Sequence, residues 1–216
     1  MATPFRLLIF DMDDTLVSSR YWTPAETRLF NLLGEPFRPD IARQYKGMNA
    51  GDVGRTIHAH LQPADYTAED CARLLREFLL ATAQEETTAP MPGADALLRA
   101  VAGRYELAVA SGAPLAVIRA MLARFGWLDW FSWLVSSEEV PRGKPAPDVF
   151  LEALRRGGRR AEEALIIEDS LLGVQAAKRS GMACWAVPGG DDPRIVAAAD
   201  RVFTSLDEMI PVLLYI

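Results

Sequence analysis

Two acidic residues with the spacing of a catalytic pair stand near the start of the chain. Asp11 and Asp13 directly follow the apolar run 7–10, so they come where an expected strand ends. At such a position one carboxylate can attack phosphorus, while the other protonates the leaving oxygen and then activates water. Polar residues occupy comparable places later in the chain, namely Ser111 with Gly112, Lys144, and Asp169. These residue types predict phosphoryl-transfer chemistry.

The remaining polar residues suit a site for a phosphate group and a divalent cation. Carboxylate oxygens are ligands that Mg²⁺ favours, and Asp169 would complete a metal site begun by Asp11. Ser111 and Gly112 precede an expected helix, whose amides attract anions. Lys144 supplies a positive charge for a phosphate. Each residue taken alone also fits a helix cap or turn, but four strand ends that all carry such residues favour one shared site.

The elements that must position these residues follow from the apolar pattern. Short apolar runs at 107–110, 133–135, 164–167 and 183–187 alternate with helical patterns at 94–103, 114–125, 147–156 and 170–180. This alternation is typical of βαβ units with a parallel sheet covered on both faces. The run 7–10 joins the same set of strands. We therefore predict an α/β fold with a doubly wound, Rossmann-like parallel sheet.

The segment between the first acidic motif and the second expected strand has a different pattern of apolar residues. Residues 17–88 show helical patterns near 23–33, 38–45, 50–61 and 66–86 and no convincing strand. The sequence therefore predicts two domains. Residues 1–16 and 89–216 form the catalytic core, and residues 17–88 form a helical insert.

Composition restricts the classes of partner. The 216 residues carry a net charge of −6, which disfavours nucleic acid and anionic membranes as partners. No apolar run approaches the roughly 20 residues of a membrane span, and no secretory signal is evident. We expect a cytoplasmic protein, a monomer by default, whose two cysteines, Cys71 and Cys184, are buried thiols.

Four motifs in this order resemble the haloacid dehalogenase superfamily, on the side of its phosphatases and β-phosphoglucomutase-like members. They are an Asp-x-Asp-x-Thr loop at 11–15, Ser111-Gly112, Gly143-Lys144-Pro145, and Glu168-Asp169 with Gly173. The resemblance covers nearly the whole chain. It implies that the helical insert is a cap that closes over the site.

The resemblance also assigns roles. It implies that Asp11 is the nucleophile that forms an aspartyl-phosphate and that Asp13 is the general acid and base. It implies that Asp11, Asp169 and the backbone carbonyl of Asp13 hold Mg²⁺, with Glu168 at the edge of that site. Ser111, Gly112 and Lys144 would bind the phosphoryl group. The stretch 43–49 resembles a substrate-specificity loop, so Lys46 and Arg43 are candidates for contacting the rest of the substrate.

The function predicted from these observations is a Mg²⁺-dependent phosphatase for a small metabolite, such as a sugar phosphate or phosphoglycolate. A sugar phosphomutase is the first alternative, but the cap histidine of such relatives is missing near Thr23. A dehalogenase would lack the second aspartate of the first motif, which is Asp13 here. A non-catalytic phosphate-binding module is disfavoured because the full set of catalytic residue types is present.

Overall fold

The computed structural model describes residues 5–45, 47–85, 88–187 and 192–215. Its centre is one six-stranded sheet with the order β3-β2-β1-β4-β5-β6, in which every neighbouring pair is parallel. The predicted doubly wound α/β fold is confirmed. The strands are β1 (Leu7–Phe10), β2 (Glu106–Ser111), β3 (Trp133–Ser136), β4 (Ala164–Glu168), β5 (Ala183–Ala186) and β6 (Arg201–Val202).

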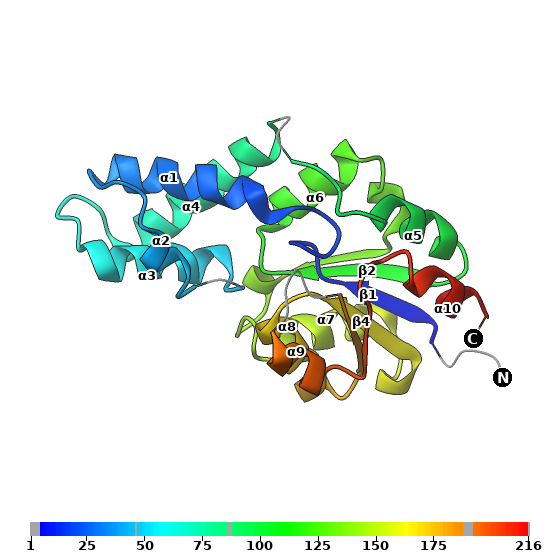
Figure 1. Cartoon of the computed structure of the whole chain (residues 1–216). Helices are drawn as coiled ribbons and strands as arrows, with labels where there is room; N and C mark the ends of the chain where they lie inside the picture. Colours follow the sequence, from blue (N-terminus) through cyan, green and yellow to red (C-terminus); the bar gives the residue numbers. More distant parts are fainter. Residues whose placement is uncertain (1–4, 46, 86–87, 188–191, 216) are drawn as a thin grey trace.

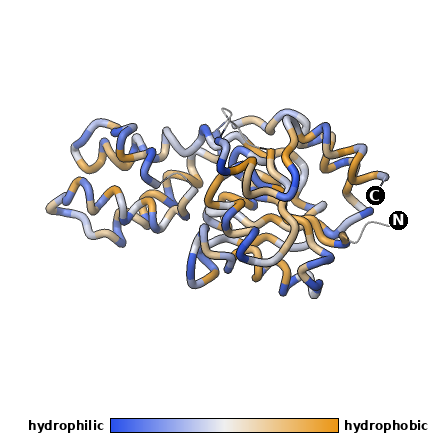
Figure 2. Tube along the Cα trace, turned by 60° about the horizontal axis from the view of Figure 1, so that its bottom comes forward, coloured by the Kyte–Doolittle hydropathy of each residue, from blue (hydrophilic) through white to orange (hydrophobic). Residues whose placement is uncertain are grey.

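Both faces of the sheet are covered, as the continuous apolar strands require. Leu8 and Phe10 point into one apolar layer, whereas Leu7 and Ile9 point into the other. In Figure 1 one face carries α5 (Ala94–Val101), α6 (Leu115–Arg124) and α10 (Met209–Tyr215). The opposite face carries α7 (Asp148–Gly157), α8 (Leu171–Ser180) and α9 (Pro193–Ala198). In Figure 2 apolar residues run through the middle of the core and also along its helices.

Beside the sheet lies a helical lobe, which we define as residues 19–83 (Figure 1). It contains α1 (Trp22–Leu32), α2 (Pro39–Ala42), α3 (Ala50–Leu61) and α4 (Ala68–Ala83). Helices α3 and α4 pack closely because Gly54 has no side chain. A Cβ atom there would lie 2.4 Å from the Cα of Ala72. The described residues also form 3-10 turns, of which η1 (Ser19–Tyr21) lies in the lobe. The others, η2 (Leu128–Trp130), η3 (Ser137–Glu139) and η4 (Ala161–Glu163), lie in the core.

The two segments that connect the lobe to the core run side by side. The amide of Ser18 donates to the carbonyl of Ala89 at 2.9 Å, and the amide of Met91 donates to the carbonyl of Leu16 at 2.9 Å. A bridge between Val17 and Pro90 lies between these two bonds. The predicted boundaries at 17 and 88 fall in these segments, and the division into two domains stays a prediction.

Several elements differ from the sequence-based expectation. A helix was expected to continue to residue 45, but α2 ends at Ala42, and Tyr45 lies in the turns that follow. Helices α9 and α10 and the two-residue strand β6 were not predicted, because each is too short for a clear apolar period. Cys71 and Cys184 are buried free thiols, as expected. Within the described residues no helix has the length and apolar character needed to cross a membrane.

Candidate active site

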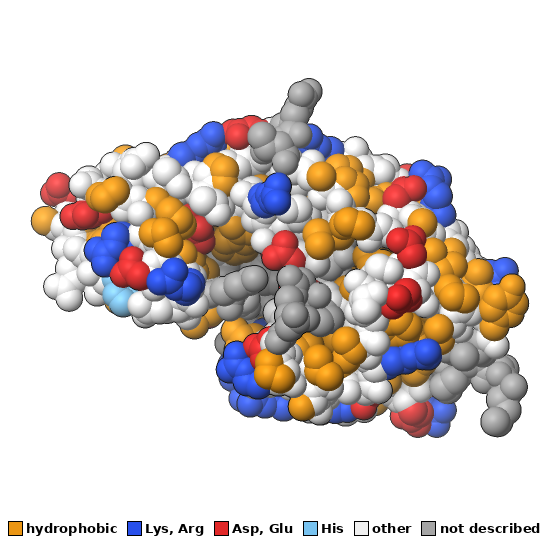
Figure 3. Space-filling model, in the orientation of Figure 1, with side chains coloured by type: hydrophobic (Ala, Val, Ile, Leu, Met, Phe, Trp, Pro, Cys, Tyr) orange, Lys and Arg blue, Asp and Glu red, His pale blue; other side chains and the backbone are white. Residues whose placement is uncertain are grey.

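The carboxyl ends of the strands bring the predicted residues to one edge of the sheet. Strand β1 lies between β2 and β4, with Phe10 paired to Val109 on one side and Ile167 on the other. The chain order reverses at this place, which is where ligands bind in open α/β sheets. A cavity of about 370 Å³ opens there, between the core and the helical lobe. Figure 3 shows the surface hollowed where the two parts meet.

Most of the predicted site residues share this cavity. Its lining includes five of them, namely Asp11, Asp13, Gly112, Lys144 and Asp169, together with Arg43. Ser111 at the end of β2 is fully buried and does not line the cavity; its hydroxyl accepts a hydrogen bond from the amide of Ala113 at 3.1 Å. Lys46 lies outside the described residues.

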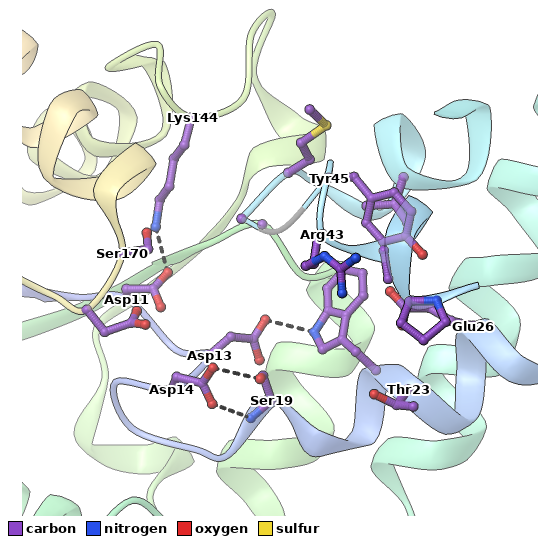
Figure 4. Close-up of a pocket in the computed structure, with 18 of the residues that line it drawn as sticks. Asp11, Asp13, Asp14, Ser19, Thr23, Glu26, Arg43, Tyr45, Lys144 and Ser170 are labelled. Atoms are coloured by element: carbon purple, nitrogen blue, oxygen red, sulfur yellow. Dashed lines mark hydrogen bonds and ion pairs between the residues drawn. The ribbon is translucent and has the colours of Figure 1, made fainter. Parts of the chain in front are cut away.

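A buried ion-pair network surrounds Lys144, and Figure 4 shows its contact with Asp11. Its Nζ lies 2.6 Å from Oδ1 of Asp11 and 2.7 Å from Oε1 of Glu168. The ammonium also lies 4.8 Å from the centre of the Phe150 ring. Burial lowers the pKa of this lysine, but the charges of Asp11 and Glu168 outweigh burial and raise it. Lys144 is therefore held as a cation beside the predicted nucleophile.

Glu168, expected at the edge of a metal site, contacts both Lys144 and the start of α8. Its Oε2 accepts hydrogen bonds from the amides of Asp169 at 2.8 Å and Ser170 at 2.7 Å, and from the Ser170 hydroxyl at 3.0 Å. These bonds fix the carboxylate so that Oε1 meets Lys144. Gly173 leaves the space for it, because a Cβ there would lie 1.6 Å from Oε1 of Glu168.

Negative charge accumulates around Asp11 and Asp169. Burial raises the pKa of both carboxyls, and the neighbouring carboxylates, Glu168 foremost, add to the rise. Lys144 opposes this effect in each case. Thr15 donates its hydroxyl to Oδ1 of Asp169 at 3.3 Å. One lysine thus faces three buried carboxylates, and a further cation would relieve the remaining repulsion.

This donor set fits Mg²⁺. Within the described residues no cluster of three or more His, Cys, Asp or Glu side chains is arranged to hold a metal ion. Mg²⁺ does not require one, because it usually engages one or two carboxylates and keeps several waters. Asp11 and Asp169 supply two carboxylates. Asp11 accepts its hydrogen bond from Lys144 at Oδ1. No donor among the described residues contacts its second oxygen, Oδ2, which is therefore available to a metal ion.

Asp13 is oriented by two residues of the helical lobe. The Tyr21 hydroxyl donates to Oδ1 at 2.7 Å, and the indole N–H of Trp22 donates to Oδ2 at 3.0 Å. Burial raises the pKa of Asp13 to about 6, while the two hydrogen bonds act in the opposite direction. A carboxyl with such a pKa can both donate and accept a proton near neutral pH. The sequence analysis did not identify Tyr21 and Trp22.

The residue after Asp13 makes the turn that leads into the lobe. Asp14 has a φ of 59°, in the left-handed region that favours glycine. Its carboxylate accepts hydrogen bonds from the amide and hydroxyl of Ser19 at 2.9 and 2.8 Å. The short polar side chain therefore stabilises the turn locally.

The loop before α3 rests against two core glycines. The carbonyl of Gly112 accepts a hydrogen bond from the amide of Ala50 at 3.3 Å. A Cβ on Gly112 would lie 3.1 Å from the carbonyl oxygen of Met48. A Cβ on Gly143 would lie 2.8 Å from Nδ2 of Asn49. Glycines in the two phosphate-site motifs therefore let the helical lobe approach the core closely.

Two further polar residues line the cavity far from the strand ends, and the sequence analysis missed both. They are Glu26 on α1 and Tyr45 after α2. One signal for Glu26 was present, because it shares a helical face with Leu29 and Phe30 and so belongs to the buried side of α1. No local pattern marks Tyr45, whose place depends on how the lobe folds.

Comparison with known proteins agrees with this geometry. A family model described as haloacid dehalogenase-like hydrolase matches residues 5–181, which confirms the resemblance seen in the motifs. Hexitol phosphatase B of Escherichia coli K12 is 30% identical over 223 residues, an alignment that covers 97% of each chain. The bifunctional riboflavin kinase/FMN phosphatase of Arabidopsis thaliana is 37% identical over 137 residues. That match covers 62% of this chain and 35% of the longer plant protein.

A solved structure shares the arrangement of core and lobe. CbbY from Rhodobacter sphaeroides, in complex with phosphate, superposes with a TM-score of 0.84. It is 27% identical in sequence, and the superposition covers 95% of this chain and 96% of that one.

Proposed function

The chain belongs to the haloacid dehalogenase-like hydrolases, and from that premise we propose that it is a Mg²⁺-dependent phosphatase for a small phosphorylated metabolite. Its relative hexitol phosphatase B, aligned over nearly the full length of both chains, supports hydrolysis of a phosphate ester. The observation that carries the proposal is the contact of Lys144 with Asp11, at 2.6 Å, inside a cavity that Asp13 and Asp169 also line.

In the proposed first step, Asp11 is the nucleophile. Its free carboxylate oxygen forms a bond to phosphorus while the bond between phosphorus and the ester oxygen breaks. Asp13, in its protonated form, donates a proton to the departing oxygen, which leaves as an alcohol. Lys144 balances the charge of the carboxylate and of the phosphoryl oxygens.

In the proposed second step, Asp13 takes a proton from a water molecule. The water oxygen bonds to phosphorus, the bond between phosphorus and Asp11 breaks, and inorganic phosphate leaves with Asp11 restored. The raised pKa of Asp13, about 6, suits a group that must first give and then take a proton. Tyr21 and Trp22 hold it on the side of the helical lobe, where the leaving group lies in this proposal.

Asp11 and Asp169, with the backbone carbonyl of Asp13, are the groups that would hold Mg²⁺. When bound, the ion supplies positive charge that lowers the repulsion between an anionic ester and a carboxylate-rich cavity. Gly112 and Lys144 remain our candidates for phosphate binding, because both line the cavity. Ser111, which is buried beneath the cavity surface, would contribute to phosphate binding from there.

The test is phosphate release by the purified protein from a panel of phosphorylated metabolites, with Mg²⁺ and with EDTA. Asp11→Asn keeps the size of the side chain but removes the nucleophile, so we expect release to fall at least about 10⁴-fold. Asp129→Asn is the matched control, since Asp129 is exposed in η2 and distant from the cavity lining. Release that is insensitive to EDTA or to Asp11→Asn would contradict the proposed mechanism.

The same panel of substrates distinguishes a phosphatase from the alternative functions. A sugar phosphomutase uses the same kind of covalent intermediate but returns the phosphoryl group to sugar. It would give an isomerised sugar phosphate when a sugar bisphosphate is added, with little free phosphate. Binding of Mg²⁺ and phosphate without turnover of any compound would instead indicate a binding module.

A further inference from the structure

The end of the cavity away from the strand ends holds a polar pair that the proposed reaction does not use. Glu26 on α1 is only 6% exposed, and Tyr45 is 3% exposed. Both line the cavity, and Figure 4 shows them on the lobe side, with Arg43 between them and the aspartates in this view. The Tyr45 hydroxyl is buried without a hydrogen-bond partner among the described residues.

Glu26 is also poorly compensated. Among the described residues it forms no ion pair, and no hydrogen bond of normal geometry to its carboxylate is found. Burial raises its pKa to about 7, and only the nearby Tyr45 hydroxyl acts against this rise. The Glu26 charge in turn adds to the effect of burial in raising the pKa of Tyr45.

Packing does not explain this pair. The other buried residues of α1 are Ala25, Leu29 and Phe30, so an apolar residue at position 26 would suit the same helical face. A buried carboxylate without a cation costs stability, as does a buried hydroxyl without a partner. A bound molecule that supplies hydrogen-bonding groups at this end of the cavity would remove both losses of stability.

The surrounding cavity indicates the chemistry of that molecule. The walls of the cavity include the apolar side chains of Trp22, Phe37, Met48 and Val53. Among the described lining residues, five are acidic (Asp11, Asp13, Asp14, Glu26 and Asp169) and only Lys144 and Arg43 are basic. Lys144 already contacts Asp11 and Glu168. Four of these acids lie just after strand ends, so the described charged lining residues on the lobe side are Glu26 and Arg43. Neutral hydroxyl groups can donate to Glu26, whose negative charge would repel an anionic leaving group.

We propose that Glu26 and Tyr45 form a hydroxyl-binding subsite, so that the enzyme favours phosphate esters of neutral polyhydroxylated alcohols and sugars over those of hydroxy acids. This inference rests on the phosphatase function proposed above. Glu26 accepts a hydrogen bond from one substrate hydroxyl, and Tyr45 donates to or accepts from another. The apolar walls pack against the carbon skeleton between them.

The experiment compares substrates that differ only in what these residues would contact. Values of kcat and KM are measured for a hexitol monophosphate, for phosphoglycolate and for para-nitrophenyl phosphate, which lacks aliphatic hydroxyls. The readout is selectivity, the ratio of kcat/KM for the hexitol ester to that for para-nitrophenyl phosphate. Glu26→Gln and Tyr45→Phe are the test variants. Glu77→Gln and Tyr66→Phe are the controls, because both lie in the lobe but do not line the cavity.

We expect each test variant to lower the selectivity about five- to tenfold, the equivalent of one lost hydrogen bond, mainly through KM for the hexitol ester. Wild-type enzyme should also hydrolyse the hexitol ester more efficiently than phosphoglycolate. The two control variants should keep the wild-type selectivity. Melting curves of all four variants show whether each is folded, so that loss of structure is not read as loss of recognition.

Two outcomes would overturn the inference. In one, both folded test variants lose activity equally on all three esters, which means that the pair supports structure or catalysis rather than recognition. In the other, the wild-type enzyme favours phosphoglycolate, which would assign the cavity to an anionic leaving group. Neither outcome affects the phosphatase proposal. That proposal fails if wild-type protein with Mg²⁺ releases phosphate from no ester, including para-nitrophenyl phosphate.

Discussion

At the scale of single residues, the site depends on how buried charges are compensated. Lys144 meets Asp11 and Glu168 at 2.6 and 2.7 Å, and Glu168 is fixed by backbone amides. Among the residues that the structure describes, Glu26 has no ion-pair partner, and its one opposing influence is the nearby Tyr45 hydroxyl. The charges of Lys144, Asp11 and Glu168 stabilise one another, whereas the carboxylate of Glu26 can accept a hydrogen bond from a bound molecule. Single substitutions should therefore have opposite effects in the two places.

Gly173→Ala tests the compensated group. The added Cβ would lie 1.6 Å from Oε1 of Glu168, so the carboxylate must move away from Lys144. We expect stability to fall by about 3 kcal/mol, because a buried charge network is disrupted, and kcat to fall with it. Thermal melting and phosphate release are the measurements. Gln175→Ala on the same helix is the control; a Gly173→Ala protein that melts and turns over like this control would disprove the role of Gly173.

Glu26→Gln tests the uncompensated group through pH. The pKa of Glu26 is about 7 in the folded chain against an ordinary value of 4.5. As the pH rises from 4.5 to about 7, the unfolded chain loses the proton first, so the folded wild type loses stability. Tyr45, the facing titratable group, stays neutral because its pKa is raised.

Relative to wild type, Glu26→Gln should therefore gain stability across this pH interval, by on the order of 2 kcal/mol. The measurement is the free energy of unfolding of both proteins at about pH 5 and about pH 8. Taking the difference between the two proteins cancels the titration of every other group. A difference that is the same at both pH values would show that Glu26 is not desolvated as the structure indicates.

At the scale of elements, the helices of the lobe depend on their first turns. Asn49 caps α3 by accepting a hydrogen bond from the amide of Asp52 at 2.9 Å. Thr67 and Asp70 form a reciprocal capping box at the start of α4, which packs against α1 and α3. These caps set where the helices begin, and so they position the residues that close the cavity.

Thr67→Ala removes one side of the capping box. We expect a loss of about 1 kcal/mol, or a fall in Tm of about 2–4 °C for a chain of this size, because the amide of Asp70 loses its partner. Thr27→Ala is the control, since Thr27 lies inside α1 and its hydroxyl donates to the carbonyl of Thr23 in the same helix. Differential scanning calorimetry gives both values. Equal melting temperatures for the two variants would contradict a capping role for Thr67.

Elements also explain how much the sequence could predict. The core strands and the residues at their ends were predictable because β1 and β4 are short apolar runs that stop at Asp11 and Glu168. The contacts of Tyr21 and Trp22 with Asp13 were not, because they depend on the direction in which the chain leaves the turn at Asp14. Short elements such as β6 carry too few residues to show a period.

At the scale of the whole molecule, metal binding should couple to stability. Asp11 and Asp169 repel each other across the cavity, so a cation that binds only the folded chain stabilises it. At about ten times its dissociation constant, Mg²⁺ should add about 1.4 kcal/mol and raise Tm by about 3–6 °C. The shift is measured against EDTA. It should disappear in Asp169→Asn and persist in Asp129→Asn, and a shift retained in Asp169→Asn would rule out this placement of the ion.

The paired connections between core and lobe have a consequence for how this architecture diversifies. Because Ser18 and Ala89 share a hydrogen bond, the lobe enters and leaves the core at almost the same point. A segment whose two ends lie side by side can be replaced by another such segment, since the core residues at the two junctions need not move to accept it. A graft of a relative's lobe between residues 17 and 90 that retains Tyr21 and Trp22, which donate hydrogen bonds to Asp13, should give a chimaera that keeps the proposed chemistry at Asp11 but acquires the donor's choice of leaving group. Selection can thus revise what the enzyme recognises without altering how it reacts.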